Sequence, residues 1–183
     1  MELLLSKKIY HVSKTSNLSI IKPHICAHNK PYIYASYHLE TALLFGGNLW
    51  TDWDFIYKRD YETGELTFSE TYPNAFQKTF KGQKCSIYEL EDSGFLKDQT
   101  NMWDEIVSLS RTKVIREIKI DDLANEIKQL EKNKKIKIEL YSNSKEYKEK
   151  IEKHITNLQK YSDIRCQRNS RDLLESFKEF IKL

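Results

Sequence analysis

The sequence predicts an α+β protein, and three observations support this fold class. Short segments with strand-forming composition, separated by turn residues, fill the first two-thirds of the chain. Longer segments with apolar residues at helical spacing dominate the last third. Residues 1–120 hold seventeen of the twenty-two aromatic residues and all three prolines, whereas residues 121–183 contain neither Gly nor Pro. We therefore expect a core domain over 1–120 and a helix-rich C-terminal lobe over 121–183, packed on the core as one compact unit.

In the first part, strands are predicted where β-forming residues cluster or alternate with polar ones. These segments are 8–13, 31–36, 53–57, 66–72, 86–90 and 114–120. The sequence Tyr-Glu-Thr-Gly at 61–64 predicts a hairpin turn between the third and fourth of them. A helix is predicted from His38, and Gly46 and Gly47 are expected to end it as a C-cap glycine does.

In the second part, Asp121 and Asp122 can cap a helix that continues to about Glu131. Residues 135–140 alternate like a strand, and Ser144 opens a second helix. A last helix is expected after residue 172. The helices should pack through apolar residues that recur at helical spacing, which are Leu123, Ile127, Leu130, Ile151, Ile155 and Leu158.

The overall composition limits the classes of protein to consider. No run of about 18 apolar residues is present, so we expect no membrane-spanning helix and no membrane partner. The apolar stretch at the N-terminus is too short for a signal peptide. Without export we expect a cytoplasmic protein in a reducing compartment, and the three cysteines, an odd number without a CxxC pair, are expected to be free thiols. The net charge of +3 comes from thirty basic and twenty-seven acidic residues, well mixed, which does not by itself indicate nucleic-acid binding.

Three segments carry residues that could form a ligand site. The first is Tyr10-His11-Val12-Ser13. The second is Tyr32-Ile33-Tyr34-Ala35-Ser36, which runs into a helix containing Ala42-Leu43-Leu44-Phe45. The third is Trp103-Asp104-Glu105-Ile106-Val107-Ser108. Together they resemble the ADP-ribosyltransferase superfamily, in the His–Tyr–Glu branch that includes diphtheria toxin, poly-ADP-ribose polymerases and rifampicin-modifying transferases. The resemblance covers roughly residues 8–120 and implies an NAD-binding core with a split antiparallel sheet.

The resemblance implies a role for each matching residue. In that branch, a His on a first strand contacts the adenosine ribose of NAD, and a Tyr on a second strand stacks on the nicotinamide. A small residue in the following helix makes room beneath that ring, and a Glu at the start of a later strand bonds the nicotinamide ribose. The implied site residues are His11 with its neighbour Ser13, Tyr34, Ala42 and Phe45 in the helix, and Glu105 as the catalytic carboxylate. Val12 departs from the small residue that is usual there, and Tyr32 competes with Tyr34 because both lie on one side of the strand.

The residue types suit the reaction that the resemblance implies. Cleavage of the nicotinamide–ribose bond passes through an oxocarbenium-like state, so a fixed carboxylate stabilises the positive charge that develops. An aromatic side chain holds the nicotinamide, and a neutral His can both donate to and accept from ribose hydroxyls. We therefore expect NAD-dependent ADP-ribosyl transfer, with NAD as co-substrate and an unidentified protein, nucleic acid or small molecule as acceptor.

Other functional interpretations stay open at this point. The chain could be a catalytically inactive module of the same fold that binds a nucleotide or a nucleic acid. It could also be an RNA 2′-phosphotransferase-like enzyme, which would need basic residues around the pocket. His11 and both tyrosines could be structural residues of the sheet, and Glu105 could be a solvated residue at the entry to a strand.

Two further residue groups have simpler explanations. His24-Ile25-Cys26-Ala27-His28 offers three zinc ligands, but a closed site needs four, so we expect a loop or edge strand and no metal site. The lysines of 134–137 could contact phosphate, as could Arg165, Arg168 and Arg171. The alternative, that these residues solvate the outer face of a helical lobe, is the more common arrangement.

Overall fold

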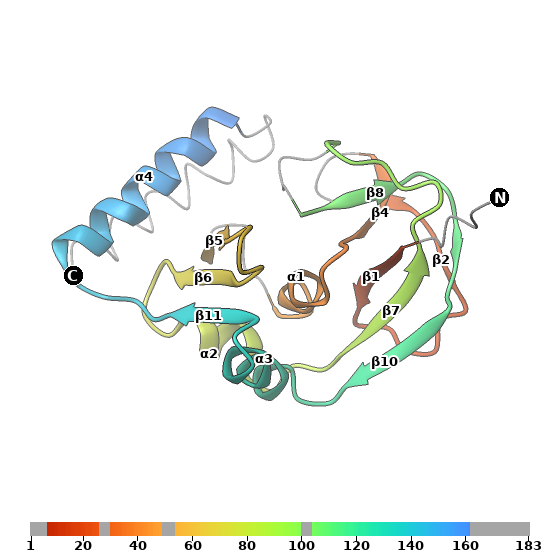
Figure 1. Cartoon of the computed structure of the whole chain (residues 1–183), viewed down its shortest axis with the longest axis horizontal. Helices are drawn as coiled ribbons and strands as arrows, with labels where there is room; N and C mark the ends of the chain where they lie inside the picture. Colours follow the sequence, from red (N-terminus) through yellow and green to blue (C-terminus); the bar gives the residue numbers. More distant parts are fainter. Residues whose placement is uncertain (1–6, 26–29, 49–53, 100–103, 162–183) are drawn as a thin grey trace. The chain divides into compact units, whose positions relative to one another are not determined.

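The computed structural model describes residues 7–25, 30–48, 54–99 and 104–161 (Figure 1). The mixture of helices and strands confirms the predicted α+β class. The chain divides into two compact units, each made from two separate stretches. Unit 1 contains residues 1–48 and 79–136, and unit 2 contains residues 49–78 and 137–183. The change in composition near residue 120 falls inside unit 1, because helix α3 (Leu123–Lys132) belongs to that unit.

The first sheet of unit 1 has β7 (Cys85–Glu91) in the centre, with β1 (Lys8–Ser13) and β10 (Arg116–Ile120) antiparallel on either side. Every residue of β7 except the last is buried, as expected for a central strand that is covered on both faces. The side chains of β10 are exposed or half-buried, which is typical of an edge strand.

The second sheet of unit 1 has β4 (Pro31–Ala35) in the centre, between β3 (His24–Ile25) and β8 (Ile106–Ser108). Both neighbours run antiparallel to β4. Pro31 is the first residue of its strand, where a missing N–H is tolerated. The short strands β2 (Ile20–Ile21) and β9 (Thr112–Lys113) pair with each other.

A bridge between Tyr10 and Ser36 joins the two sheets. The Tyr10 N–H donates to the Ser36 carbonyl at 2.8 Å, and the Ser36 N–H donates to the Tyr10 carbonyl at 2.9 Å. This bridge brings β1 beside the end of β4. Residues from both sheets then share one buried cluster, which consists of Ile9, Ile21, Ile33, Ala35, Tyr88, Leu90 and Ile106.

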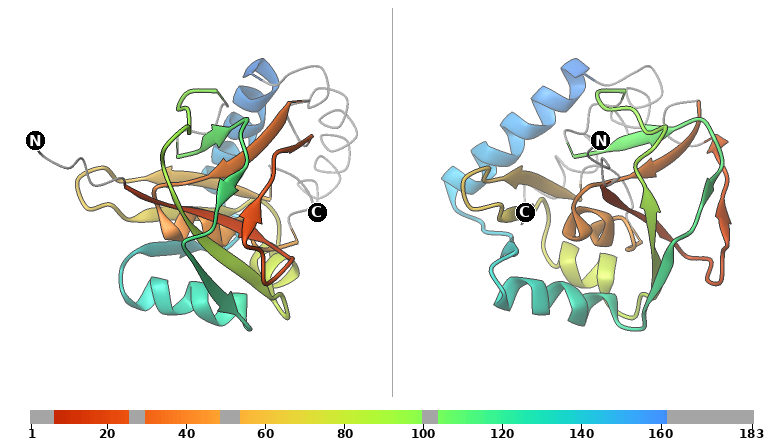
Figure 2. Two further views of the ribbon diagram at one scale, coloured as in Figure 1. Left: turned by 90° about the vertical axis from the view of Figure 1, so that its right-hand side faces the viewer. Right: turned by 45° about the vertical axis from the view of Figure 1, so that its right-hand side comes forward.

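Two helices complete unit 1. Helix α1 (Leu39–Leu44) follows β4 directly and contacts β1 and α3 (Figures 1 and 2). Helix α3 begins as predicted, because the Asp122 side chain accepts a hydrogen bond of 3.0 Å from the Asn125 N–H. Leu123 and Ile127 are fully buried, so this helix packs through its predicted apolar face.

The end of α1 corrects the expectation for Gly46 and Gly47. The helix stops where predicted, but its C-cap is Phe45 in an ordinary right-handed conformation, and neither glycine has a positive φ. Lack of space for a side chain explains why residue 46 is a glycine. A Cβ there would lie 2.8 Å from the Cys85 Sγ and 3.1 Å from the Leu43 carbonyl oxygen. Glycine is therefore needed for close packing, and its freedom of φ is not used.

Unit 2 contains the predicted hairpin, formed by β5 (Phe55–Arg59) and β6 (Leu66–Glu70). In its turn, the Asp60 Oδ1 accepts hydrogen bonds from the Glu62 N–H at 2.8 Å and from the Thr63 N–H at 3.1 Å. Gly64 has a φ of +75°, a conformation that favours glycine. Strand β11 (Ile136–Glu139) lies on the other side of β6.

Two helices accompany the strands in the described part of unit 2. Helix α4 (Lys145–Tyr161) begins after Ser144, as predicted, and buries Ile151 and Ile155. Helix α2 (Ala75–Phe80) includes the point where the chain leaves unit 2. None of the helices in the described ranges has the length and hydropathy needed to cross a bilayer.

Most predicted elements are confirmed within one or two residues of their ends. Three short strands (β2, β8, β9) and α2 had no predicted bounds, and the strand predicted from residue 114 begins at Arg116. Strand β3 lies at the edge of its sheet, which agrees with the edge strand that is one of the two alternatives for the segment beginning at His24. The segment 49–53, the helix expected after residue 172 and the side chain of Leu158 lie outside the described residues.

Candidate functional site

Strand pairing in unit 1 brings together the three segments that the sequence singled out. The Tyr10–Ser36 bridge sets the His11 strand beside β4. On its other side β4 pairs with β8, in a register that places Tyr34 opposite Val107 and Ala35 opposite Ile106. Continued by one residue, this register places Ser36 opposite Glu105. The segments that carry His11, Tyr34 and Glu105 therefore lie on neighbouring strands.

The His11 imidazole is held in one tautomer. Its Nδ1 lies 2.7 Å from the Tyr34 carbonyl oxygen. Because a carbonyl only accepts hydrogen bonds, Nδ1 carries the hydrogen and donates. Burial lowers the pKa of His11, while the hydrogen bond to Tyr34 opposes this effect and the charge of His24 adds to it. The ring is therefore neutral at physiological pH, and its Nε2, to which no described residue donates, is a hydrogen-bond acceptor.

Tyr88 packs against His11 and was not predicted to have a role in the site. The two ring centroids are 6.4 Å apart, with the planes tilted by 30°. Tyr88 is fully buried. Its hydroxyl lies 2.8 Å from the Thr15 carbonyl oxygen and 3.2 Å from the Glu117 Oε1. The same hydroxyl accepts a hydrogen bond of 3.2 Å from the Leu18 N–H. These contacts fix the loop that follows His11.

Glu117 and Ser13 take part in the same polar region. The Glu117 carboxylate accepts from the Ser86 Oγ at 2.6 Å and from the Asn17 N–H at 3.0 Å. These hydrogen bonds lower the pKa of Glu117, and the one from Ser86 has the larger effect. Ser13 is partly exposed, and its Oγ accepts from the Thr15 N–H at 3.1 Å, so this hydroxyl supports the turn after β1.

The structure distinguishes Tyr34 from Tyr32. Their rings meet edge to face, with centroids 5.8 Å apart and planes at 89°, so both lie on one side of β4 as predicted. Tyr32 is only 3% exposed, and Tyr34 is partly exposed. A ligand ring can therefore reach Tyr34 more easily than Tyr32.

The remaining predicted residues lie on α1 and just before β8. Ala42 is buried and Phe45 is partly exposed, at the end of the same helix. Glu105 immediately precedes β8, is partly exposed, and has its Oε2 atom shielded from solvent. Asp104, beside it, accepts a hydrogen bond of 2.7 Å from the Thr41 Oγ1.

Other acidic and metal-binding candidates have different surroundings. Glu89 is buried and pairs with Lys8 at 3.3 Å and Arg116 at 3.8 Å. His24 is exposed on β3, and the rest of the possible zinc cluster lies outside the described residues. Within the described part of the chain, no three metal-ligating side chains gather. Residues 165–171, with the three arginines, also lie outside the described residues.

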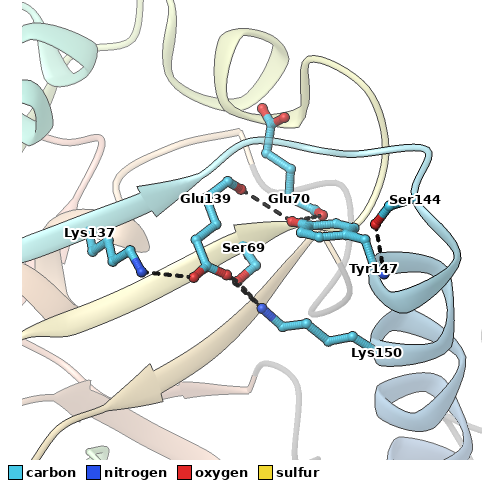
Figure 3. A network of polar contacts seen from close by, with 7 residues as sticks. All are labelled: Ser69, Glu70, Lys137, Glu139, Ser144, Tyr147 and Lys150. Carbon is cyan, nitrogen blue, oxygen red and sulfur yellow. Dashed lines mark hydrogen bonds and ion pairs between the residues drawn. The ribbon is translucent and has the colours of Figure 1, made fainter.

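Unit 2 contains a polar network around Glu139 that includes a Ser–Lys contact (Figure 3). The Lys150 Nζ lies 2.8 Å from the Ser69 Oγ and 2.6 Å from the Glu139 Oε2, and Ser69 also donates to Glu139 at 2.6 Å. A base that activates serine must be a neutral amine. The Lys150 Nζ donates to both Ser69 and Glu139, so it is placed as a hydrogen-bond donor and not as a base, and Ser69 is 1% exposed. The network is therefore a structural connection between β6, β11 and α4.

This network predicts an acid-dependent loss of stability. Hydrogen bonds from Lys150, Ser69 and Lys137 lower the pKa of Glu139 from 4.5 to about 2. The ionised carboxylate thus stabilises the fold above about pH 4.5, and this contribution is lost as the pH falls through about 2. Denaturant unfolding at several pH values should show a wild-type advantage over Glu139→Gln that shrinks in this window.

The matched control for this measurement is Glu149→Gln. The Glu149 carboxylate is exposed, and its ion pair with Lys145 is 3.8 Å long. This variant should cost little at any pH, because exposed ion pairs contribute about 0–1 kcal/mol. A wild-type advantage over Glu139→Gln that does not change with pH would contradict the role given to the carboxylate.

Comparison of the chain with models of known protein families, with curated proteins and with solved structures found no match. Function is therefore inferred from the residues and from their geometry in unit 1.

Proposed function

We propose that this protein binds NAD along β1, β4 and the segment before β8, and transfers its ADP-ribose to an acceptor. The observation that carries the proposal is the order of the strands. Tyr10 of β1 bridges Ser36 at the end of β4, and β8, which Glu105 immediately precedes, pairs with the other side of β4. The resemblance to the His–Tyr–Glu branch of ADP-ribosyltransferases requires these three segments to be neighbours. Two small antiparallel sheets joined by one bridge support the split-sheet core of that superfamily.

Each residue then has a physical task. The neutral His11 accepts a hydrogen bond from a ribose hydroxyl through Nε2, because Nδ1 is already donating to Tyr34. Tyr34 offers a partly exposed ring to the nicotinamide, and Tyr32 braces that ring from the side. Glu105 supplies negative charge to the ribose as the bond to nicotinamide breaks. Ala42 and Phe45 belong to the helix that follows the stacking residue.

The proposal is tested with the full chain and NAD alone. Calorimetry measures NAD binding, and a single-turnover assay measures release of nicotinamide, first with water and then with cell lysate as acceptor. Binding together with release supports the transferase. Binding without any release would favour the inactive binding module, and an absence of binding would overturn both.

Replacing Tyr34 with Ala should weaken NAD binding by roughly 1–3 kcal/mol, or about 5- to 150-fold, because the stacking surface is lost. Tyr34→Phe keeps the ring and should bind nearly as well as wild type. Tyr61→Ala, at an exposed position in the hairpin of unit 2, is the matched control and should not change binding. An unchanged dissociation constant for Tyr34→Ala would show that the nicotinamide does not stack on this residue.

A further inference from the structure

A histidine and two carboxylates lie beside the proposed catalytic Glu105. His38 is the N-cap residue of α1, two residues beyond Ser36, and its N–H donates to the Ser36 Oγ at 3.1 Å. Its side chain is 42% exposed, so the ring is within reach of a ligand. The His38 Nε2 lies 3.5 Å from the Asp104 Oδ1, and its Nδ1 lies 3.7 Å from the Glu40 Oε1.

Asp104 is held in place more firmly than the histidine. Its side chain is only 8% exposed, and the Thr41 Oγ1 donates to its Oδ2 at 2.7 Å. The other carboxylate oxygen, Oδ1, is the one that lies 3.5 Å from the His38 Nε2. A buried carboxylate against a partly exposed imidazole can orient the ring for proton transfer. Asp104 is also the chain neighbour of Glu105, so this pair is tied to the carboxylate proposed to act on NAD.

On the basis of the proposed function, we infer that His38 accepts the proton of a hydroxyl acceptor during ADP-ribosyl transfer, with Asp104 as its positioning residue. The bond between ribose C1′ and the nicotinamide nitrogen breaks, and its electron pair leaves with neutral nicotinamide. The acceptor oxygen forms the new bond to C1′, and its proton passes to His38 and then to solvent. Water is the simplest such acceptor, and transfer to water is NAD hydrolysis.

The surroundings of His38 favour a hydroxyl over a carboxylate acceptor. A hydroxyl oxygen gains nucleophilicity as its proton leaves, and an imidazole is suited to take that proton near neutral pH. A carboxylate acceptor needs no base, and Glu40, Asp104 and Glu105 would repel it. The distances of 3.5 and 3.7 Å are longer than hydrogen bonds, as is common for proton-transfer groups before substrate binds.

The inference predicts a characteristic dependence on pH. Among the described residues, the charged groups that face His38 are Glu40 from α1 and Asp104 from the segment before β8. Only a neutral imidazole can accept the proton, so the rate of nicotinamide release should fall as the solution is acidified. This acidic limb should be absent when His38 is replaced.

The test uses the full chain with saturating NAD, water as acceptor, and single-turnover nicotinamide release from about pH 5 to about pH 9. His38→Asn is the main variant, because Asn is a favoured N-cap residue and should keep the start of α1. We expect unchanged NAD affinity, a rate lowered about 10²-fold near neutral pH, loss of the acidic limb, and partial rescue by added imidazole. His38→Gln should behave alike, and Asp104→Asn should lower the rate and shift the acidic limb. His24→Gln, at an exposed histidine, is the control and should keep the wild-type rate near neutral pH and the acidic limb.

The outcomes separate this inference from the proposed function. If Glu105→Gln is slow while His38→Asn keeps the wild-type rate and pH profile, the inference is overturned and the proposed function stands. The same holds if His38→Asn is slow but keeps the acidic limb and does not respond to imidazole. If the wild type neither binds NAD nor releases nicotinamide, the proposed function fails and the inference falls with it.

Discussion

Replacing Glu105 with Gln should slow nicotinamide release by about 10²–10³-fold and leave NAD affinity nearly unchanged. Glutamine keeps the size of the side chain and removes only its charge. The positive charge on the ribose exists in the transition state and not in bound NAD, so the loss should appear in the rate. Glu105 immediately precedes β8 and has one carboxylate oxygen shielded from solvent, where an electrostatic contact is stronger than in water.

The measurement combines calorimetry with single-turnover release on wild type and on Glu105→Gln. Glu91→Gln is the matched control, because that side chain is exposed at the end of β7 and should be neutral in both assays. If Glu105→Gln turned over as fast as wild type, the catalytic carboxylate would lie elsewhere. Asp104, held by Thr41 beside His38, would then be the first alternative, ahead of Glu89, which already pairs with Lys8.

The elements of the site could be predicted from the sequence because their signals are local. The strand 8–13, the strand after Pro31 and the helix after His38 follow from composition and spacing within short windows. The hairpin around Gly64 follows from turn residues between two strand-like segments. Helix α2 has only six residues, too few for a helical period to stand out, and so it had no prediction.

The connections within the site could not be predicted because they join residues far apart in the chain. No local pattern pairs Tyr10 with Ser36, or β4 with the three residues of β8. The same pairing sets His38 beside Asp104, so this contact is visible only in the folded chain. Alternation places Tyr32 and Tyr34 on one side, but burial of Tyr32 and exposure of Tyr34 depend on neighbours that the alternation does not specify.

Glu70 in unit 2 is a further residue whose role emerges only from the fold. It ends β6, its side chain is almost completely buried, and each carboxylate oxygen accepts one backbone hydrogen bond. The Oε1 accepts from the Phe76 N–H in α2, and the Oε2 accepts from the Tyr141 N–H after β11, both at 2.8 Å. Glu70 thus satisfies two N–H groups from separate parts of the chain.

Replacing Glu70 with Ala should therefore lower the free energy of unfolding by about 3–6 kcal/mol, because hydrogen bonds to a charged group contribute about 1.5–3 kcal/mol each. Glu70→Gln keeps one acceptor oxygen but turns an NH₂ group toward the other N–H, so it should lose at least one of the two bonds. Denaturant unfolding gives the total effect, and amide hydrogen exchange at Phe76 and Tyr141 reports the two bonds separately. Glu62→Ala, exposed in the hairpin turn, serves as control and should change stability by less than about 0.5 kcal/mol.

Because the proposed NAD site consists of unit 1 residues, a Glu70→Gln protein that remains folded should bind NAD like wild type. Unchanged protection of the Phe76 and Tyr141 amides in Glu70→Ala would show that other groups satisfy them.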